Sequence, residues 1–367
     1  DDNLWIGTDG GGLYMYSPKE NEFANFLYNR DGNFTIADNS ILTLYQGDDH
    51  IIWAGTVHGG ISFFQNKTII RHVPPDDLAF NKADIQGSEI MEASNGDIWL
   101  SAGRDGLRRY NPENGKVSVF IDNPADDNDL SGDIVLSLFE DDQSRIWIGT
   151  LNGGVNIYDT QNNNFLTVQD RFDSKAIFAI KKDEEGNIWV GSNSGIRVYD
   201  PNLKVKRKYS KETNLNLCSN VITSLYKDIK GEMWVGTALG LNVITKDTIK
   251  TYQSIKKDLS TLSGNRIISI AEDDDLSVLI GTYGYGLNRY NRSTDNFERI
   301  GKQEGLEGNI IGGIFLDKNH NAWCSTNLGL SKIYPDGTIE NYDVKDGVQV
   351  FYGGTAIITR EGEIAMG

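Results

Sequence analysis

Apolar and polar positions along the chain repeat with a period of about 45 residues, and each period contains four short runs with the pattern of β-strands. The most regular run is Trp147-Ile148-Gly149-Thr150. This Trp run is the second of the four. The first run is apolar and ends eight residues before the Trp, the third begins at a Gly soon after the Trp run, and the fourth is shorter and more polar. A period of 40–50 residues with four strands per copy is typical of β-propeller blades.

The four runs can be located in most copies. The first run is apolar with a small residue near its middle: Ile41–Tyr45, Ile134–Phe139, Ile177–Ile180, Val221–Tyr226, Ile267–Ala271 and Ile310–Phe315. The third begins at Gly12, Gly60, Gly106, Gly154, Gly195, Gly240, Gly286 and Gly329. The fourth has the polar character of an exposed edge strand: Phe23–Leu27, Lys116–Ile121, Val205–Tyr209 and Thr338–Tyr342.

All seven tryptophans fall in one column of the second run: Trp5, Trp53, Trp99, Trp147, Trp189, Trp234 and Trp323, with Leu279 and Ala365 in the same column. A large flat side chain there is expected to fill the wedge between neighbouring blades rather than to bind a ligand. The Gly two residues later is expected to let the adjacent sheet approach. The second run occurs nine times and the others eight times, so the repeats alone leave open how the ring closes.

Composition agrees with short strands joined by tight turns, since Gly is abundant (40) and Pro scarce (7). A net charge of −17 argues against nucleic acid as a partner. The sequence contains no apolar run long enough to span a membrane, and it does not begin with the pattern expected of a signal peptide. The chain starts inside a repeat at Asp1, so both ends are expected to be cuts in a longer protein. Cys218 and Cys324 are expected to be buried apolar residues rather than a disulfide.

The sequence shows no motif for a metal, a cofactor or catalysis. The four His are scattered and have no metal-ligand spacing. Acidic turns such as Asp141-Asp142 are expected to be structural, with calcium binding as a lesser alternative. The Gly-rich stretch Asp9-Gly10-Gly11-Gly12 leads into a strand, which weakens a phosphate-binding interpretation.

Candidate ligand residues come from the turns between the second and third runs, which share one face of a propeller with the links between blades. Aromatic faces can stack on sugars, and Arg can pair with carboxylate or sulfate groups. Arg104 and the pair Tyr283 and Tyr285 depart most from the repeat, although each could be an exposed turn residue only. The predicted ligand-binding set is Arg104, Asp105, Tyr283, Tyr285, His58, Asn152 and Asn193.

The pattern Asp-x-x-Gly-x-hydrophobic-Trp-hydrophobic-Gly-Thr, seen for example in Lys227–Thr237, resembles the two-component regulator propeller repeat. About eight tandem copies cover essentially the whole chain. The resemblance implies a non-enzymatic, periplasmic sensor region of a hybrid two-component system that binds oligosaccharide from a target polysaccharide. It also implies a following β-sandwich domain, membrane helix and histidine kinase in an inner-membrane protein, which is expected to be a homodimer.

In this family two seven-bladed propellers are usual. The resemblance therefore favours a seven-bladed ring over residues 76–367 with its last blade truncated. Residues 1–75 would then come from a preceding propeller or complete the ring. The alternative is one eight-bladed propeller over residues 1–367.

Two other functions remain open. A propeller enzyme, either a streptogramin-inactivating lyase or a calcium-dependent hydrolase, would need inward acids at the channel. The column just before the first strand is mostly amide, which makes a poor divalent site: Asn39, Asp133, Lys175, Asn220, Asn265 and Asn309. A protein-interaction scaffold is the other alternative.

Overall fold

The fold was analysed in a computed structural model of the 367-residue chain. It describes residues 3–8, 10–17, 19–20, 22–30, 35–46, 51–56, 59–65, 68–73, 90–101, 106–123, 129–166, 176–214, 216–273, 276–317, 319–343, 345, 356–358 and 364–366.

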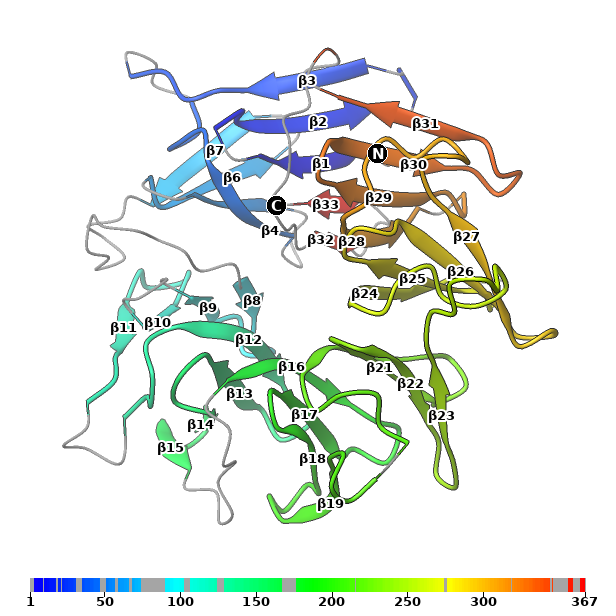
Figure 1. The fold of residues 1–367 in the computed structure, drawn as a ribbon. Coiled ribbons are helices and arrows are strands. Elements are labelled where there is room, and N and C mark those ends of the chain that lie inside the picture. The colour runs from blue at the N-terminus through cyan, green and yellow to red at the C-terminus, as the bar shows by residue number, and fades with distance from the viewer. Residues whose placement is uncertain are drawn as a thin grey trace.

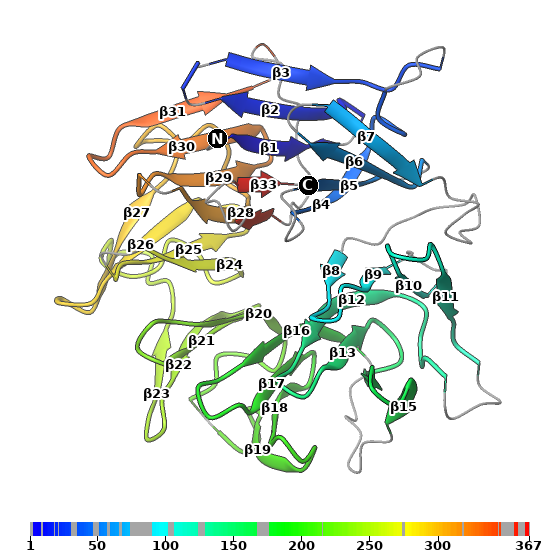
Figure 2. The same ribbon diagram turned by 180° about the vertical axis from the view of Figure 1, so that it is seen from behind.

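The described residues form eight sheets that stand around a central axis as the blades of a propeller (Figures 1 and 2). Blade 1 contains β1 (Leu4–Gly7), β2 (Leu13–Ser17) and β3 (Glu22–Phe26), joined by β32 (Ala356–Ile358) and β33 (Ile364–Met366). Blades 2 to 4 are β4 (Ile41–Gln46), β5 (Ile52–Thr56), β6 (Ile61–Gln65) and β7 (Thr68–Val73); β8 (Ile90–Glu92), β9 (Ile98–Ser101), β10 (Leu107–Tyr110) and β11 (Val117–Phe120); β12 (Val135–Glu140), β13 (Arg145–Thr150), β14 (Val155–Asp159) and β15 (Asn164–Leu166).

Blades 5 and 6 are β16 (Ile177–Lys182), β17 (Ile188–Ser192), β18 (Gly195–Tyr199) and β19 (Val205–Tyr209); β20 (Ile222–Lys227), β21 (Met233–Thr237), β22 (Gly240–Ile244) and β23 (Ile249–Tyr252). Blades 7 and 8 are β24 (Ile267–Glu272), β25 (Val278–Thr282), β26 (Leu287–Asn291) and β27 (Asn296–Ile300); β28 (Ile311–Leu316), β29 (Ala322–Thr326), β30 (Gly329–Ile333) and β31 (Ile339–Tyr342). Within blades 2 to 8 all neighbouring strands pair antiparallel, so the predicted all-β propeller of four-stranded blades is confirmed.

The ring closes in blade 1, where strands from the two ends of the chain meet. The innermost strands β32, β4, β8, β12, β16, β20, β24 and β28 contact one another in cyclic order. In blade 1, β33 pairs with β1 in parallel, with Ala365 opposite Trp5. The ninth copy of the Trp column therefore lies beside the first copy in the same sheet.

Eight blades correct the favoured count of seven, and the alternative prediction of eight is the one the structure bears out. The physical reason is that β32 and β33 add to the sheet of β1–β3 instead of forming a blade of their own. The division of the chain into domains stays a prediction.

The apolar side chains form eight clusters, one at each interface between consecutive blades, and each cluster contains one residue of the Trp column. Going round the ring from the interface of blades 1 and 2, these residues are Trp5, Trp53, Trp99, Trp147, Trp189, Trp234, Leu279 and Trp323. Each is at most 5% exposed and packs against the next blade. The column therefore has the structural role predicted from the sequence.

The acidic turns fix the Trp column by a hydrogen bond that sequence reasoning missed. The indole Nε1 of Trp147 donates to the Asp141 carboxylate at 2.8 Å, and the pairs Trp189–Asp183, Trp234–Asp228 and Trp323–Asp317 repeat this contact at 2.8–2.9 Å. The other carboxylate oxygen of Asp141 accepts the backbone N–H groups of Gln143 and Arg145. Each Asp thus closes its turn and holds the Trp six residues later, as a structural turn residue.

The Gly two residues after the Trp lets the next blade approach, as predicted. A Cβ atom on Gly236 would lie 2.8 Å from Cγ2 of Ile267 in blade 7 and would also overlap the Ser224 hydroxyl oxygen in its own blade. Such a distance is too short for any real Cβ atom, so the two blades would have to separate.

The variant Gly236→Ala is therefore expected to lower the free energy of unfolding by about 1–3 kcal/mol, the usual cost of overpacking. Urea denaturation measures the change. Gly301→Ala is the matched control, because a Cβ there would meet only the Glu304 carboxylate at 3.5 Å. Equal stability of the two variants would contradict the proposed close approach.

Candidate functional site

One face of the ring is formed by the turns between the second and third strands and by the linkers between blades, and we call this face the rim. Backbone hydrogen bonds join the turns to the linkers: Leu151 N–H to Ile134 O, Ala238 N–H to Val221 O, Tyr283 N–H to Arg266 O and Asn327 N–H to Ile310 O. Some turns also bond to the linker that leads into the following blade, as where Gly284 and Gly286 both donate to Asn309 O. Turns and linkers therefore form one continuous surface.

Amide side chains hold the rim linkers in place from both ends. The Oδ1 atoms of Asn39, Asn220 and Asn265 accept the backbone N–H of Tyr28, Lys211 and Ser254, at 2.6–2.7 Å. These residues belong to the amide column noted in the sequence, so their side chains close linkers instead of offering ligands to a metal. A linker fixed in this way presents its side chains in a preorganised geometry.

Buried Asn residues in the third strands complete this anchoring. Asn242 and Asn288 are fully buried, and their Oδ1 atoms accept the N–H of Cys218 at 2.9 Å and of Ser263 at 2.7 Å. Asn156 holds Ser131 in the same manner.

Four of the seven predicted ligand residues lie on the described rim, and the structure does not gather them into one cluster. Tyr283 (46% exposed) and Tyr285 (61% exposed) stand on blade 7. Asn152 and Asn193 are exposed on blades 4 and 5. Arg104, Asp105 and His58 lie outside the described residues. The two tyrosines are thus separated in the ring from the two asparagines.

The tyrosines of blade 7 adjoin Arg266, a residue that the sequence analysis missed. The Arg266 guanidinium carbon lies 4.3 Å from the centroid of the Tyr283 ring, within the range of a cation–π contact. The Tyr285 ring lies against Gly264, where an added Cβ would come 2.7 Å from Cγ of the ring. A signal was present in the sequence, because the residues that directly follow the amide column are Ser40, Ile134, Ala176, Val221, Arg266 and Ile310, of which only Arg266 is charged.

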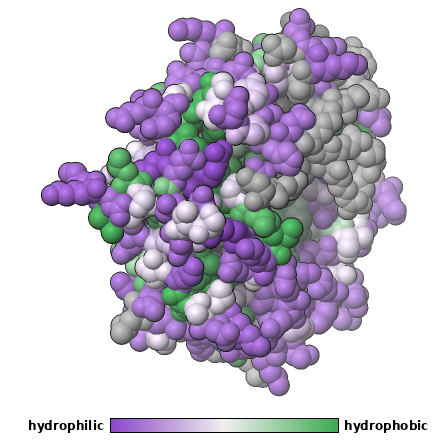
Figure 3. Space-filling model, turned by 90° about the vertical axis from the view of Figure 1, so that its right-hand side faces the viewer, coloured by the Kyte–Doolittle hydropathy of each residue, from purple (hydrophilic) through white to green (hydrophobic). Residues whose placement is uncertain are grey.

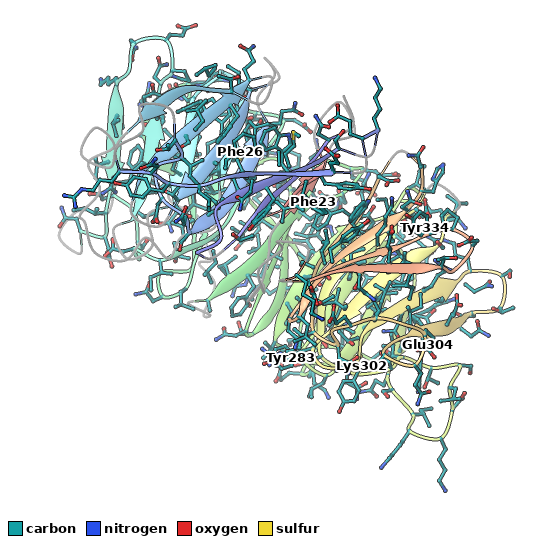
Figure 4. All side chains as sticks on the ribbon, turned by 90° about the horizontal axis from the view of Figure 1, so that it is seen from above. Phe23, Phe26, Tyr283, Lys302, Glu304 and Tyr334 are labelled. Atoms are coloured by element: carbon teal, nitrogen blue, oxygen red, sulfur yellow. The ribbon has the colours of Figure 1, made fainter. Side chains whose placement is uncertain are left out.

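Hydrophobic and hydrophilic residues are interspersed on the outer side of blades 7 and 8. Figure 3, which looks at the side occupied by blades 7 and 8, shows small hydrophobic patches between mostly hydrophilic side chains. Figure 4, which views the ring from above, shows Tyr283, Lys302 and Glu304 along one edge of the molecule, toward the bottom of the picture. Large exposed apolar residues on the rim include Leu239, Ile255, Leu259 and Leu328.

Two cavities lie between blades on the opposite face, where the acidic turns are. One of about 360 Å³ lies between blades 5 and 6 and is lined by Asp183, Trp189, Lys206, Lys230 and Lys246 among others. The second, of about 590 Å³, lies beside Arg289 and Arg292. Their ionic groups are largely engaged in pairs such as Lys206–Glu185 at 2.7 Å and Arg292–Glu232 at 3.0 Å, so these cavities are weaker candidates than the rim.

No group of three or more His, Cys, Asp or Glu that could hold a metal occurs within the described ranges. Both cysteines are free and buried. Burial raises the pKa of the Cys218 thiol to about 11 and that of Cys324 to about 12, so neither is a nucleophile near neutral pH. The part of the chain that the structure describes contains no helix long and apolar enough to cross a membrane.

Comparison with known families identifies the repeat. Residues 129–152, 171–194 and 216–238 match the family described as two component regulator propeller. Among curated proteins, the chain is 27% identical over 158 residues to histidine kinase P4 of Formosa agariphila. The match covers 42% of this chain and 11% of the relative, so it spans about a ninth of that protein.

Solved structures show the same fold. The extracellular domain of a B. thetaiotaomicron protein described as a one component system matches with a TM-score of 0.61 at 20% identity, over 98% of this chain and 51% of that chain. A streptogramin B lyase matches with a TM-score of 0.55 at 15% identity, over 84% of this chain and 95% of that chain. At these identities the likeness is one of fold.

Proposed function

Because the chain carries the repeats of the two-component regulator propeller family, we propose that it is the extracytoplasmic ligand-sensing propeller of a hybrid two-component system and binds an oligosaccharide on its rim. The observation that carries this proposal is the pair of exposed tyrosines on blade 7. Sugar rings stack on aromatic faces, and Tyr283 and Tyr285 offer such faces on a backbone fixed by hydrogen bonds. Asn152 and Asn193, with Arg104, Asp105 and His58, are proposed as further ligand contacts around the rim.

Signal transfer is proposed to pass through the rest of a longer protein. The curated relative is a histidine kinase of which this chain matches a small part. We propose that a β-sandwich domain, a membrane helix and a kinase follow in the same polypeptide, that the protein is a periplasmic homodimer, and that bound sugar shifts the placement of domains. A ligand can do this only by its difference in affinity for the two arrangements.

The region is proposed to have no catalytic activity of its own. The fold is shared with a streptogramin B lyase, but a propeller fold alone does not indicate its chemistry. The support for a binding role is that Asn39, Asn220 and Asn265, which stand where an enzyme would need inward acids, are already engaged in closing linkers.

Calorimetry with a panel of neutral and acidic oligosaccharides tests the proposed function. We expect saturable binding to at least one of them and a loss of about tenfold or more in affinity in the double variant Tyr283→Ala/Tyr285→Ala, since stacking on two rings is worth at least 1.4 kcal/mol. Thermal unfolding should stay unchanged, because both side chains are exposed. Absence of binding by every sugar, including to the full-length protein, would refute the proposal.

The domain division is also a proposal: because β1–β7 supply two of the eight blades of the ring, we propose one propeller over residues 1–367 rather than a separate seven-bladed one over residues 76–367 preceded by another propeller. Expression of residues 76–367 alone tests it. A single cooperative thermal transition supports the separate seven-bladed propeller, whereas an unfolded product supports one propeller over residues 1–367.

A further inference from the structure

We infer that the rim of blades 6–8 selects an oligosaccharide that carries negative charge, as carboxylate or sulfate groups, and that Arg266 is the residue that recognises it. The inference rests on the proposed function, because it names the chemical class of ligand for the same face. By the rim of blades 6–8 we mean linkers 210–221, 253–266 and 301–310 with turns 238–239, 283–285 and 327–328.

Arg266 is an exposed cation whose backbone and side chain both contact Tyr283, while its positive charge is not paired with a carboxylate of the described residues. Its backbone carbonyl accepts the Tyr283 N–H at 2.9 Å, and its guanidinium lies over the Tyr283 ring. No carboxylate pairs with it among the described residues. A guanidinium whose only described neighbour of this kind is an aromatic ring can still use its N–H groups to bind the two oxygens of a carboxylate or sulfate.

Two other arginines of blade 7 have guanidinium groups that are fully engaged by partners. Arg299 donates to the carbonyl oxygens of Asp258, Thr261 and Leu262 at 2.8–2.9 Å and so holds the linker between blades 6 and 7. Arg292 binds three carboxylates on the other face. Arg266 has neither kind of partner, so its role is not explained by the stability of the fold.

The lysines of this rim form no salt bridge within the described residues, whereas three of its four acids are hydrogen-bonded within their own loops. Lys211, Lys256, Lys257 and Lys302 form no ion pair in the described structure. Hydrogen bonds from the Ser210 side chain and the backbone lower the pKa of Glu212, and those from Ser260 lower the pKa of Asp258. The Glu304 carboxylate accepts the Gly301 N–H at 2.7 Å. Local hydrogen bonds thus hold three of the acids in place and leave the cations free for a ligand.

The rim of blades 6–8 therefore differs in charge from the molecule as a whole. It contains five basic residues and four acidic ones, in a chain whose net charge is −17. An acidic protein repels anionic polymers in general, so a local excess of unpaired cations beside stacking tyrosines favours anion binding at this place. Tyr283, Tyr285 and Arg266 together offer a stacking surface with an anion-binding edge.

Binding assays with three sets of oligosaccharides of equal length test the inference: galacturonate oligomers with carboxylates, sulfated galactan oligomers, and uncharged galactan oligomers. We expect one of the two charged sets to bind at least tenfold more tightly than the uncharged set, with affinity falling as NaCl rises. The variant Arg266→Ala should lose about tenfold or more for the charged set and nothing for the uncharged set. Arg266→Lys should recover part of the loss, since it keeps the charge without the planar fork. Lys230→Ala, on the opposite face, is the matched control and should change neither affinity.

The outcomes separate this inference from the proposed function. If uncharged sugars bind as well as charged ones and Arg266→Ala binds normally, the inference fails while oligosaccharide sensing stands. If no sugar of any set binds, both fail. If carboxylated and sulfated sugars differ, the tighter set identifies which anionic group Arg266 recognises. If Arg266→Ala unfolds at the same temperature as the unmodified protein, misfolding is excluded as the cause of any loss of affinity.

Discussion

The variant Arg292→Ala is expected to be about 3–5 kcal/mol less stable than the unmodified protein, because it removes the cation from a buried group of carboxylates. Arg292 comes from blade 7 and binds Asp228 of blade 6 at 2.7 Å and Glu272 of its own blade at 2.7 Å. The Asp228 side chain is fully buried and that of Glu272 is 6% exposed. Without Arg292 these two negative charges would remain buried and uncompensated. Urea denaturation followed by Trp fluorescence measures the change.

Arg289→Ala is the control for Arg292→Ala. Arg289 lies three residues earlier and, among the described residues, forms an ion pair with the exposed Glu298 at 3.4 Å, so its loss should cost about 0–1 kcal/mol. If both variants were equally stable, the buried group would contribute nothing beyond a surface ion pair.

The effect of Arg292→Ala should also depend on pH. Burial raises the pKa of Asp228, but hydrogen bonds from Arg292, Trp234 and the Glu232 amide together outweigh it and hold the pKa below its usual range. Because the pKa of Asp228 is lower in the folded protein, its ionised form stabilises the fold at pH values above its pKa in the unfolded chain, about 3.9. This stabilisation is lost as the pH falls through the pKa of Asp228 in the folded protein. In the variant the hydrogen bonds from Trp234 and the Glu232 amide remain, but the hydrogen bond and the charge of Arg292 are lost, so Asp228 can take up a proton more readily. The stability difference between the two proteins should therefore narrow as pH falls from 7 toward 4.

The variant Trp147→Ala is expected to lose about 3–5 kcal/mol, the usual cost of deleting a buried Trp. Trp147 is fully buried in the cluster between blades 4 and 5, where it packs with Ile177, Ile188 and Tyr199. Its ring centroid lies 5.4 Å from that of Tyr199. The cavity left by its removal would weaken the contact between these two blades, as thermal or urea denaturation will show.

Substitution by Phe separates the packing of the Trp column from its hydrogen bond. Trp147→Phe also removes the Nε1–H that Asp141 accepts, whereas the buried Nε1 of Trp99 has no hydrogen-bond partner in the structure. Residue 93, six positions before Trp99, is Ala rather than Asp. Trp147→Phe should therefore cost about 1.5–3 kcal/mol more than Trp99→Phe. Equal losses would show that the Asp–Trp bond adds nothing to packing.

The sequence was sufficient to predict the blades because their spacing and patterning are local. A Trp every 45 residues, a Gly two residues later and a Gly that opens the third strand each reflect contacts within a blade or with the next one. The opening Gly residues, such as Gly195 with a φ of 107°, indeed have the positive φ values that only Gly adopts easily.

Ring closure and the ligand face could not be predicted with the same success. Closure depends on β33 pairing with β1 from the other end of the chain, and these short strands carry no pattern that specifies a parallel partner. Arg266 lies in a linker and not in a turn, and it stands beside Tyr283 only through the pairing of turn and linker. Such a contact depends on tertiary structure and not on position in the repeat.

The division of the apolar side chains into eight separate clusters has a consequence for how the molecule responds to damage. Without one central core, stability is close to a sum of couplings between nearest neighbours arranged on a circle. Losses at distant interfaces, such as those of Trp147 and Arg292, should then add, since sites without shared partners are independent. A circle also differs from a linear array in that breaking one coupling leaves every blade with one intact neighbour. The rim could therefore change in sequence and specificity one blade at a time while the rest of the circle keeps its shape.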